Sequence, residues 1–382
     1  MKIVLFHFSD KFASDIKRAN MFQKGIKKIF QKWTIVPIVA FITFALTELA
    51  SRNPSFVESY YSQNIYPKIA GVFSVISNIF PFSLDDQFYI LLIATTILLV
   101  LLLLFKKNSI KKSGKIVVNI LASTYILFYV LWGFNYYRED LNTRLEIKEQ
   151  KPDSATFVQN LEILIEKTNH SACTFEMFDK KEIDLLIESS YKRLAPLLKI
   201  TYPSGKRKDK KITFSRFFAQ AGISGYYGPF FNEVHVNTNI LPIEYPFVLA
   251  HEKAHQLGIT SEAEANFYAW LVCTQSNSKQ LQYSANLHIL KFFLLQGYQL
   301  EEYSKIVSKI DESVITDFQR IRKNWEKLRN EKVEKTASKV NHAYLKTNKV
   351  ERGIEDYQGV VKYVLDFSMD TTFKNKHNLN LN

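Results

Sequence analysis

The chain has 382 residues, and its 47% hydrophobic residues are concentrated N-terminal to Arg138, which indicates a membrane anchor followed by one soluble domain. The formal net charge of +13 does not indicate nucleic-acid binding, because many Lys and Arg residues flank apolar stretches and no basic-aromatic motif of a known module occurs. Two cysteines, Cys173 and Cys273, are too few for a zinc ribbon or a disulfide framework.

Three apolar segments are long enough to cross a bilayer as helices, at residues 33–49, 88–105 and 116–134. Trp132, Tyr136 and Tyr137 close the third segment with aromatic rings, which are enriched where a span leaves the membrane. The first segment is not a cleavable signal peptide, because a long basic region precedes it and two further spans follow. We therefore predict a basic N-terminus at 1–32 and a membrane domain at 33–138.

Charges in the short flanking loops set the orientation of these spans. Basic residues gather before the first span and between the second and third, at Lys17, Arg18, Lys24, Lys27, Lys28, Lys32, Lys106, Lys107, Lys111, Lys112 and Lys115. The stretch between the first two spans has only Arg52 and Lys68 as basic residues. The positive-inside rule places the N-terminus and the Lys-rich loop in the cytoplasm, so with three spans the C-terminal domain lies outside it.

The segment 65–82, between the first two spans, is moderately apolar. Pro67, Lys68, Asn78 and Pro81 make it a poor span. We expect an interfacial or re-entrant helix there. A fourth span would instead place the C-terminal domain on the cytoplasmic side.

After the membrane domain, residues 139–155 form a polar stretch that we predict to be a linker to a soluble domain at 156–382. Helical patterns cover 157–168 and 181–198, and a Lys-rich loop follows at 204–211.

Between Ile212 and Asn239 the sequence becomes rich in aromatic and β-branched residues and in Gly, which favours short strands. The alternation of polar and apolar residues over 232–237 predicts a strand. We expect Glu233 and His235 on it to face solvent or to line a cleft. The rest of the chain, after Pro242, is largely helical, with no internal repeat.

The sequence His251-Glu252-Lys253-Ala254-His255 contains the residues that we expect to bind a metal ion and act in catalysis. Two histidines four residues apart on a helix project from one face, close enough to bind one metal ion. Zn²⁺ bound by imidazoles requires that geometry and leaves a position for water, and Glu252 can act as the general base on that water. We expect Lys253 to point away from the histidines and extend to solvent.

The residues around this motif predict two consecutive helices. Pro246 can open the first helix, and Gly258 falls where a left-handed C-terminal cap is expected. Ser261 and Glu264 match a capping box at the start of a second helix. A helix, a tight turn and a second helix that carries a carboxylate can supply a third zinc ligand.

Two carboxylates on the second helix are candidates for that ligand. Glu262 and Asn266 share a face, so one can bind the metal while the other supports a ligand. Glu264 is the alternative, although it already has a role in the capping box, and a carboxylate farther along the chain is a third possibility. We expect the metal ligands to be His251, His255 and Glu262.

The block HEKAHQLG followed by EAEANFYAWL resembles the gluzincin zinc metallopeptidases, in which HExxH is followed by Glu-x-x-x-Asp/Asn on the next helix. This resemblance implies that Glu262 is the third ligand and that Asn266 braces a histidine. It also implies a mainly α protein: N-terminal transmembrane helices, then a zincin-like α+β domain with a small sheet and an HExxH active-site helix.

From Tyr60 to Tyr363 the chain also resembles an uncharacterised bacterial family of membrane-anchored candidate zinc peptidases, a numbered domain of unknown function. The stretches that carry the resemblance are YYSQNIYP (60–67), PFSLDD (81–86), LWGFNYYRED (131–140), GISGYYGPFFNEVHVN (222–237) and NHAYLKTNKVERGIEDYQGVV (341–361). It implies a multi-pass protein of the bacterial inner membrane with an extracytoplasmic catalytic domain.

Residues 228–237 resemble the edge strand that runs along the gluzincin cleft, which implies a peptide or protein substrate held by strand addition. His342, Tyr344 and Tyr357 are candidates for stabilising the oxyanion. The function expected is therefore zinc-dependent hydrolysis of peptide bonds. A membrane-tethered binding or sensing protein with a structural zinc site is the alternative, and a non-peptidase zinc amidohydrolase is a third. The sequence indicates no oligomeric state.

Overall fold

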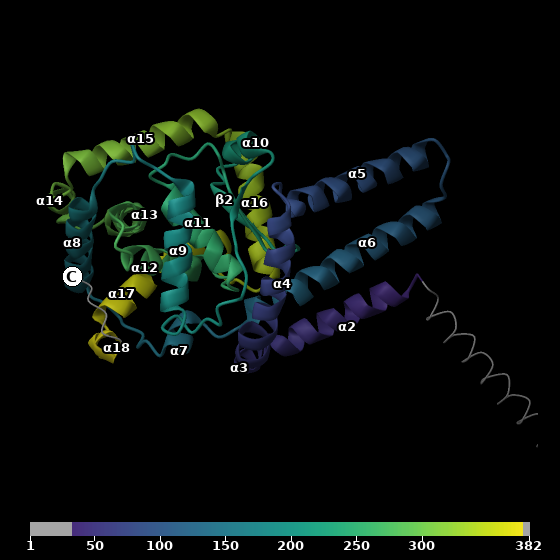
Figure 1. Cartoon of the computed structure of the whole chain (residues 1–382), viewed down its shortest axis with the longest axis horizontal. Coiled ribbons are helices and arrows are strands. Elements are labelled where there is room, and N and C mark those ends of the chain that lie inside the picture. The colour runs from purple at the N-terminus through teal and green to yellow at the C-terminus, as the bar shows by residue number, and fades with distance from the viewer. Residues whose placement is uncertain (1–32, 377–382) are drawn as a thin grey trace, which may run out of the picture. The chain divides into compact units, whose positions relative to one another are not determined.

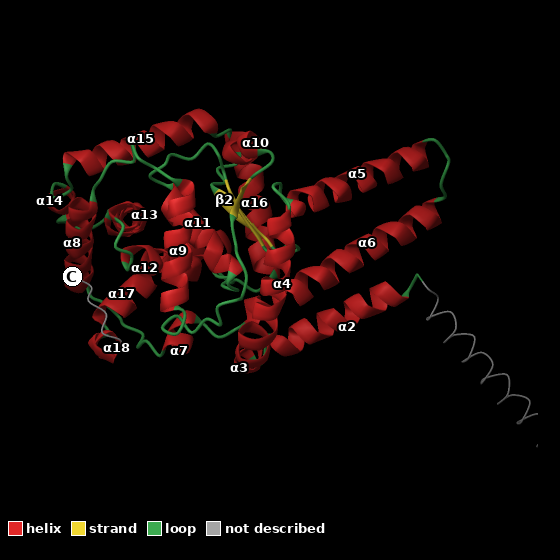
Figure 2. Cartoon of the chain, viewed as in Figure 1, coloured by secondary structure: helices red, strands yellow, loops and turns green. Residues whose placement is uncertain are grey.

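The computed structural model describes residues 33–376, so the predicted basic N-terminus lies outside the described residues. The chain divides into two compact units. The span unit comprises Met1–Leu49 and Leu91–Val130, and the main unit comprises Ala50–Ile90 and Leu131–Asn382. Figure 1 follows the chain in order, and Figure 2 shows that helices dominate it.

The span unit contains α2 (Ile35–Ala50) and most of α5 (Leu84–Leu104) and α6 (Ile110–Leu131). Within residues 33–376, only α5 and α6 are by themselves long and apolar enough to cross a membrane, and they overlap the predicted segments 88–105 and 116–134. The first predicted span, 33–49, corresponds to α2, which passes as a span only together with the following helix, Pro54–Ile79, as one bent span. The described residues therefore offer two to three spans, which is compatible with membrane association.

The main unit is mainly helical. Its helices up to residue 220 are α3 (Pro54–Phe56), η1 (Val57–Ile65), α4 (Tyr66–Ile79), η2 (Gly133–Tyr137), α7 (Leu141–Leu145), α8 (Ser154–Ser171), α9 (Lys180–Leu194) and α10 (Ser215–Gln220). Those after residue 240 are α11 (Tyr245–Gln256), α12 (Glu262–Thr274), α13 (Lys279–Gly297), α14 (Tyr303–Val307), α15 (Glu312–Leu328), α16 (Glu331–Thr347), η3 (Gly353–Gly359), α17 (Val360–Met369) and α18 (Thr371–Lys376).

The core of the main unit is built around α11 and α12. Every residue of α11 is buried, as is every residue of α12 up to Cys273, so neither helix shows a solvent-facing stripe. The two helices pack on each other and both pack on α9 and α13. Each large apolar side chain that they bury stabilises the fold by about 1.5–3 kcal/mol.

A three-stranded mixed sheet lies against α11. Its strands are β1 (Asp209–Lys211), β2 (Gly225–Gly228) and β3 (Glu233–Val236), in the order β1-β3-β2. β3 pairs in parallel with β1 and antiparallel with β2. The strand predicted over 232–237 is therefore present, but it is the central strand. The expectation of an edge strand over 228–237 is wrong, because both hydrogen-bonding edges of β3 are already used.

Glu233 and His235 on β3 neither face solvent nor line a cleft; they are 2% and 0% exposed. Glu233 is ion-paired with Lys210 and accepts a hydrogen bond from Ser77 Oγ at 2.8 Å. His235 Nε2 contacts Ser83 Oγ at 2.7 Å. Both side chains therefore belong to a buried polar cluster between the sheet and the segment that leads into α5.

Two stretches assigned from sequence to the membrane domain and the linker pack into the main unit. The stretch at 65–82 forms α4, whose buried face includes Tyr66 and Ala70, at 1% and 0% exposed. In the polar stretch 139–155, α7 buries Leu141 and Leu145. The compact units thus differ from the predicted domain boundaries, because these residues carry apolar side chains into the core.

Candidate metal centre

The turn between α11 and α12 holds the HExxH residues next to the following helix. Pro246 lies in the first turn of α11, and Gly258 adopts the left-handed conformation (φ +88°) just beyond its end. Ser261 caps α12, and its hydroxyl accepts a hydrogen bond from the backbone N–H of Glu264 at 3.3 Å. These local signals are those expected from the sequence.

Asp356 adds a second hydrogen-bond acceptor to the N-terminal cap of α12. No pattern in the sequence predicts its position there. One Asp356 carboxylate oxygen accepts hydrogen bonds from Glu262 N at 2.8 Å and from Ser261 Oγ at 2.9 Å. An acidic group at a helix N-terminus satisfies free N–H groups and interacts favourably with the helix dipole. Asp356 thereby fixes the backbone of the residue predicted to be the third ligand.

The structure brings His251, His255 and Glu262 together, with one potential ligand atom from each lying within 4.8 Å of the others. The two Nε2 atoms are 3.1 Å apart. They lie 3.1 Å and 3.4 Å from the same oxygen, Oε2 of Glu262. A tetrahedral Zn²⁺ about 2.0–2.1 Å from each ligand separates the ligands by roughly 3.3 Å. The spacing and the donor set of two imidazoles and one carboxylate therefore fit zinc.

Backbone contacts orient the two histidines differently. His255 Nδ1 lies 2.7 Å from the carbonyl oxygen of Ile259, and because a carbonyl only accepts, Nδ1 carries the proton and Nε2 presents its lone pair to the triad. His251 Nδ1 is buried and has no hydrogen-bond partner within residues 33–376. Asn266, expected to brace a histidine, instead donates from its amide to the carbonyl oxygen of Tyr357 at 3.2 Å.

Charge within the triad shifts the pKa values of its members. Burial alone would raise the pKa of Glu262, but the two histidines outweigh this effect and hold that pKa well below its usual range. Burial lowers the pKa of His255, but the Glu262 carboxylate more than compensates and raises it to about 9. The contact between opposite charges thus favours the ionised form of Glu262 and the protonated form of His255.

The proposed base, Glu252, is 5% exposed and packs against strand β2. A Cβ added at Gly225 would lie 2.8 Å from Glu252 Oε1 and 2.9 Å from its Cγ, so only glycine leaves room for this side chain. Burial raises the pKa of Glu252 to about 7, while the positive charge of the histidines lowers it and Glu262 raises it.

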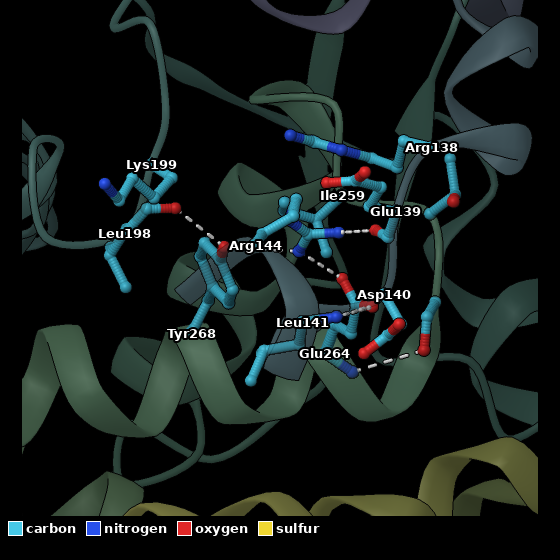
Figure 3. A network of polar contacts seen from close by, with 12 residues as sticks. Arg138, Glu139, Asp140, Leu141, Arg144, Leu198, Lys199, Ile259, Glu264 and Tyr268 are labelled. Carbon is cyan, nitrogen blue, oxygen red and sulfur yellow. Dashed lines mark hydrogen bonds and ion pairs between the residues drawn. The ribbon is translucent and has the colours of Figure 1, made fainter. Parts of the chain in front are cut away.

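Glu264, the alternative ligand, is used elsewhere. Its Oε1 accepts from Leu141 N at 3.0 Å, and its Oε2 forms a 2.5 Å ion pair with Arg144. Figure 3 shows this network, in which Tyr268 of the same helix also donates to the carbonyl oxygen of Leu198 at 2.9 Å. The geometry therefore places Glu262 in the triad and Glu264 in a contact that holds α7 against α12.

The expectation that Lys253 extends to solvent is wrong. Its side chain is buried, with Nζ 2.9 Å from Asp184 Oδ1 and 2.5 Å from Glu188 Oε1. Both carboxylates belong to α9, which packs on the face of α11 that carries Lys253. Paired carboxylates permit burial of the ammonium group, which would otherwise be costly.

Of the three candidates for stabilising an oxyanion, Tyr357 lies beside the triad. Its ring stacks near that of His251, with centroids 6.4 Å apart, and burial beside the Glu262 and Glu252 carboxylates raises the pKa of its hydroxyl well above the usual value. The hydroxyl of Tyr344 accepts a hydrogen bond from Tyr136 at 3.0 Å. His342 Nδ1 accepts from the backbone of Ile354.

Two aromatic residues that the sequence did not link to the HExxH motif hold the C-terminal end of α11. The indole N–H of Trp132 donates to the carbonyl oxygen of His255 at 3.0 Å. The hydroxyl of Tyr66 donates to the carbonyl oxygen of Gln256 at 2.7 Å. Both bonds are made to main-chain atoms, so no pattern of side chains in the sequence points to them.

Residues 61–365 match a family described as "Protein of unknown function (DUF3810)". No curated protein and no solved structure matches the chain. The resemblance to gluzincins therefore rests on the residues of α11 and α12 alone. Because the family match covers most of the chain and includes the whole triad, the protein belongs to the DUF3810 family.

Proposed function

We propose that this protein is a membrane-anchored zinc metallohydrolase that cleaves peptide bonds, with a zincin-like catalytic domain. The observation that carries the proposal is the buried group of His251, His255 and Glu262, with ligand atoms within 4.8 Å of one another. Three protein ligands leave a tetrahedral ion one open position, which is typical of catalytic zinc sites, whereas structural sites are closed by four.

Zn²⁺ held by these three residues would supply a water of lowered pKa and a positive charge that polarises the substrate carbonyl. The Glu252 carboxylate takes one proton from the attacking water and passes it to the amide nitrogen as the C–N bond breaks. Each turnover therefore returns Glu252 to its ionised form. The hydroxyl of Tyr357 lies beside Glu262 and is placed to orient that carboxylate.

The membrane assignment is supported by α5 and α6, which are long and apolar enough to cross a bilayer. The Lys-rich loop between them and the basic N-terminus favour a cytoplasmic location for both. With three spans, the main unit lies on the extracytoplasmic face of a bacterial inner membrane.

A second candidate is a membrane-tethered sensor whose zinc is structural. The observation that favours it is the low exposure of the three ligands, at 8%, 7% and 9% for His251, His255 and Glu262. A catalytic site must admit its substrate, whereas a structural site need not. Measurements of metal content and cleavage on the same variants separate the two.

The test uses the full-length protein, purified in detergent and exposed to a peptide library whose products are read by mass spectrometry. We expect about one zinc per chain in the wild type and none in His251→Ala/His255→Ala. Glu252→Gln should keep zinc and lose cleavage, whereas Glu312→Gln, at an exposed position, should keep both.

Zinc in the wild type at the level of the double histidine variant would refute the metal site. Cleavage retained in Glu252→Gln would reject this base. Zinc without any cleavage that depends on Glu252 would favour the sensor.

A further inference from the structure

The residue that directly follows α6, an apolar helix of membrane length, contacts the turn between α11 and α12. α6 ends at Leu131, and the next residue, Trp132, donates its indole N–H to the carbonyl oxygen of His255. The ring of Trp132 also lies 6.4 Å from the His255 ring. Leu131 and Trp132 are adjacent in the chain, with Cα atoms about 3.8 Å apart, so the hydrogen bond of Trp132 holds the end of α6 close to the backbone of His255.

The same turn is held from a second direction by α4. Tyr66 donates to the carbonyl oxygen of Gln256, and a Cβ added at Gly258 would lie 3.0 Å from the Tyr66 ring. α4 ends at Ile79, and α5, the second helix of membrane length, begins at Leu84. The turn between α11 and α12 is therefore contacted by Trp132, which directly follows one candidate span, and by Tyr66 of α4, the helix that precedes the other.

The outward side of α4 and the turn after it carries exposed apolar side chains. They are Ile65, Val72, Val75, Ile76, Ile79, Phe80 and Phe82. The exposed Lys68 interrupts this apolar surface, as expected where a long basic side chain reaches lipid headgroups. Because α4 is followed within a few residues by a helix of membrane length, the occupant that fits this surface is the interfacial layer of the bilayer.

Glu233 ties the first turn of α5 to the centre of the sheet. Its carboxylate accepts hydrogen bonds from Leu84 N at 3.1 Å and Asp85 N at 3.0 Å, while its own strand, β3, pairs with β2. β2 is the strand that packs against Glu252. Within the main unit, the candidate base and the first turn of α5 are therefore connected through β2, β3 and Glu233.

From these contacts we propose that the site works at the bilayer surface and that its substrates are membrane-anchored polypeptides, cut in the stretch next to the bilayer. This inference rests on the proposed peptidase function and adds the substrate class. Confining enzyme and substrate to one membrane raises their effective concentration, so a scissile stretch beside the anchor should be cut at least about tenfold faster than the same stretch in solution.

The location is tested without reference to activity. Single cysteines at Val75 or Ile79, in a Cys173→Ser background, carry an environment-sensitive fluorophore in full-length protein reconstituted into vesicles of phosphatidylethanolamine and phosphatidylglycerol. We expect lipids with nitroxide headgroups to quench both labels and to leave a label at Met177, which is 92% exposed, unquenched. Labels at Val75 and Ile79 that are quenched no more than the one at Met177 overturn the inference.

The substrate class is tested with one randomised peptide cassette in three settings. The cassette follows a transmembrane anchor directly, follows the anchor after a long Gly/Ser spacer, or lacks an anchor. We expect the wild type to cut the first at least about tenfold faster than the other two, and Glu252→Gln to cut none.

Equal cleavage of all three cassettes that depends on Glu252 overturns this inference and leaves the peptidase function standing. If no cleavage depends on Glu252, both the peptidase function and the substrate class are refuted. The labelling experiment still reports whether α4 lies at the bilayer surface.

Discussion

The ion pairs of Lys253 predict a large stability effect at a residue that lies between His251 and His255 in the sequence. Replacement by Met keeps most of the apolar stem and removes the charge, which leaves Asp184 and Glu188 buried. Breaking a buried ion pair by removing one partner costs about 3–5 kcal/mol. Glu188 keeps a second partner, Arg207, at 2.9 Å, so we expect the lower end, about 3 kcal/mol. For a domain of this size that lowers Tm by about 6–12 °C.

The assay is thermal unfolding of full-length Lys253→Met in detergent, followed by near-UV circular dichroism with a chelator present, because bound metal would add its own stabilisation. Lys323→Met is the matched control, since that lysine is exposed. Adding Asp184→Asn to Lys253→Met should restore part of the lost stability. A Tm within about 2 °C of the control would refute the reasoning.

Burial raises the pKa of Glu188, but its ion pairs outweigh this effect and lower it to about 2, below the ordinary value of 4.5. Its stabilisation is therefore complete above pH 4.5 and lost as pH falls towards 2, so denaturant titrations should show a steeper loss over this range in the wild type than in Glu188→Gln. Gly225→Ala should displace Glu252 and reduce cleavage while zinc content stays constant; Gly114→Ala, whose added Cβ meets nothing within 4 Å, is the control, and unchanged cleavage would refute the packing argument. Tyr357→Phe removes the hydroxyl beside Glu262 and should weaken zinc binding about 10–100-fold in competition with a chelating dye, whereas unchanged affinity would contradict a role for this hydroxyl in orienting Glu262.

What the sequence predicted well depends on neighbouring residues. Pro246, Gly258 and Ser261 each act on backbone within a few positions, and the structure has the two helices and the turn that they indicate. The fourfold spacing of His251 and His255 likewise fixes their common face by helix geometry alone.

What the sequence did not predict depends on residues far apart in the chain. Glu188, a partner of Lys253, lies 65 positions upstream, and Asp356, which completes the cap of α12, lies 95 positions downstream of Ser261. The central place of β3 depends in the same way on pairing with β1, across a register that no local pattern encodes. Such contacts depend on how whole elements pack together. From sequence alone, a charged residue in a helix is therefore predicted to face solvent, because the positions of its distant partners are unknown.

The position of α4 bears on how this protein can change over evolution. Tyr66, Ala70 and Asp85 lie before the third span in the chain and are almost completely buried in the main unit. A gene fragment starting at Leu131 would encode a domain that lacks these residues and leaves Glu233 without its partners from 77–85. The part of the main unit after Val130 therefore cannot be passed on as a separate cassette, and a descendant without α4 would have to rebuild this part of its core.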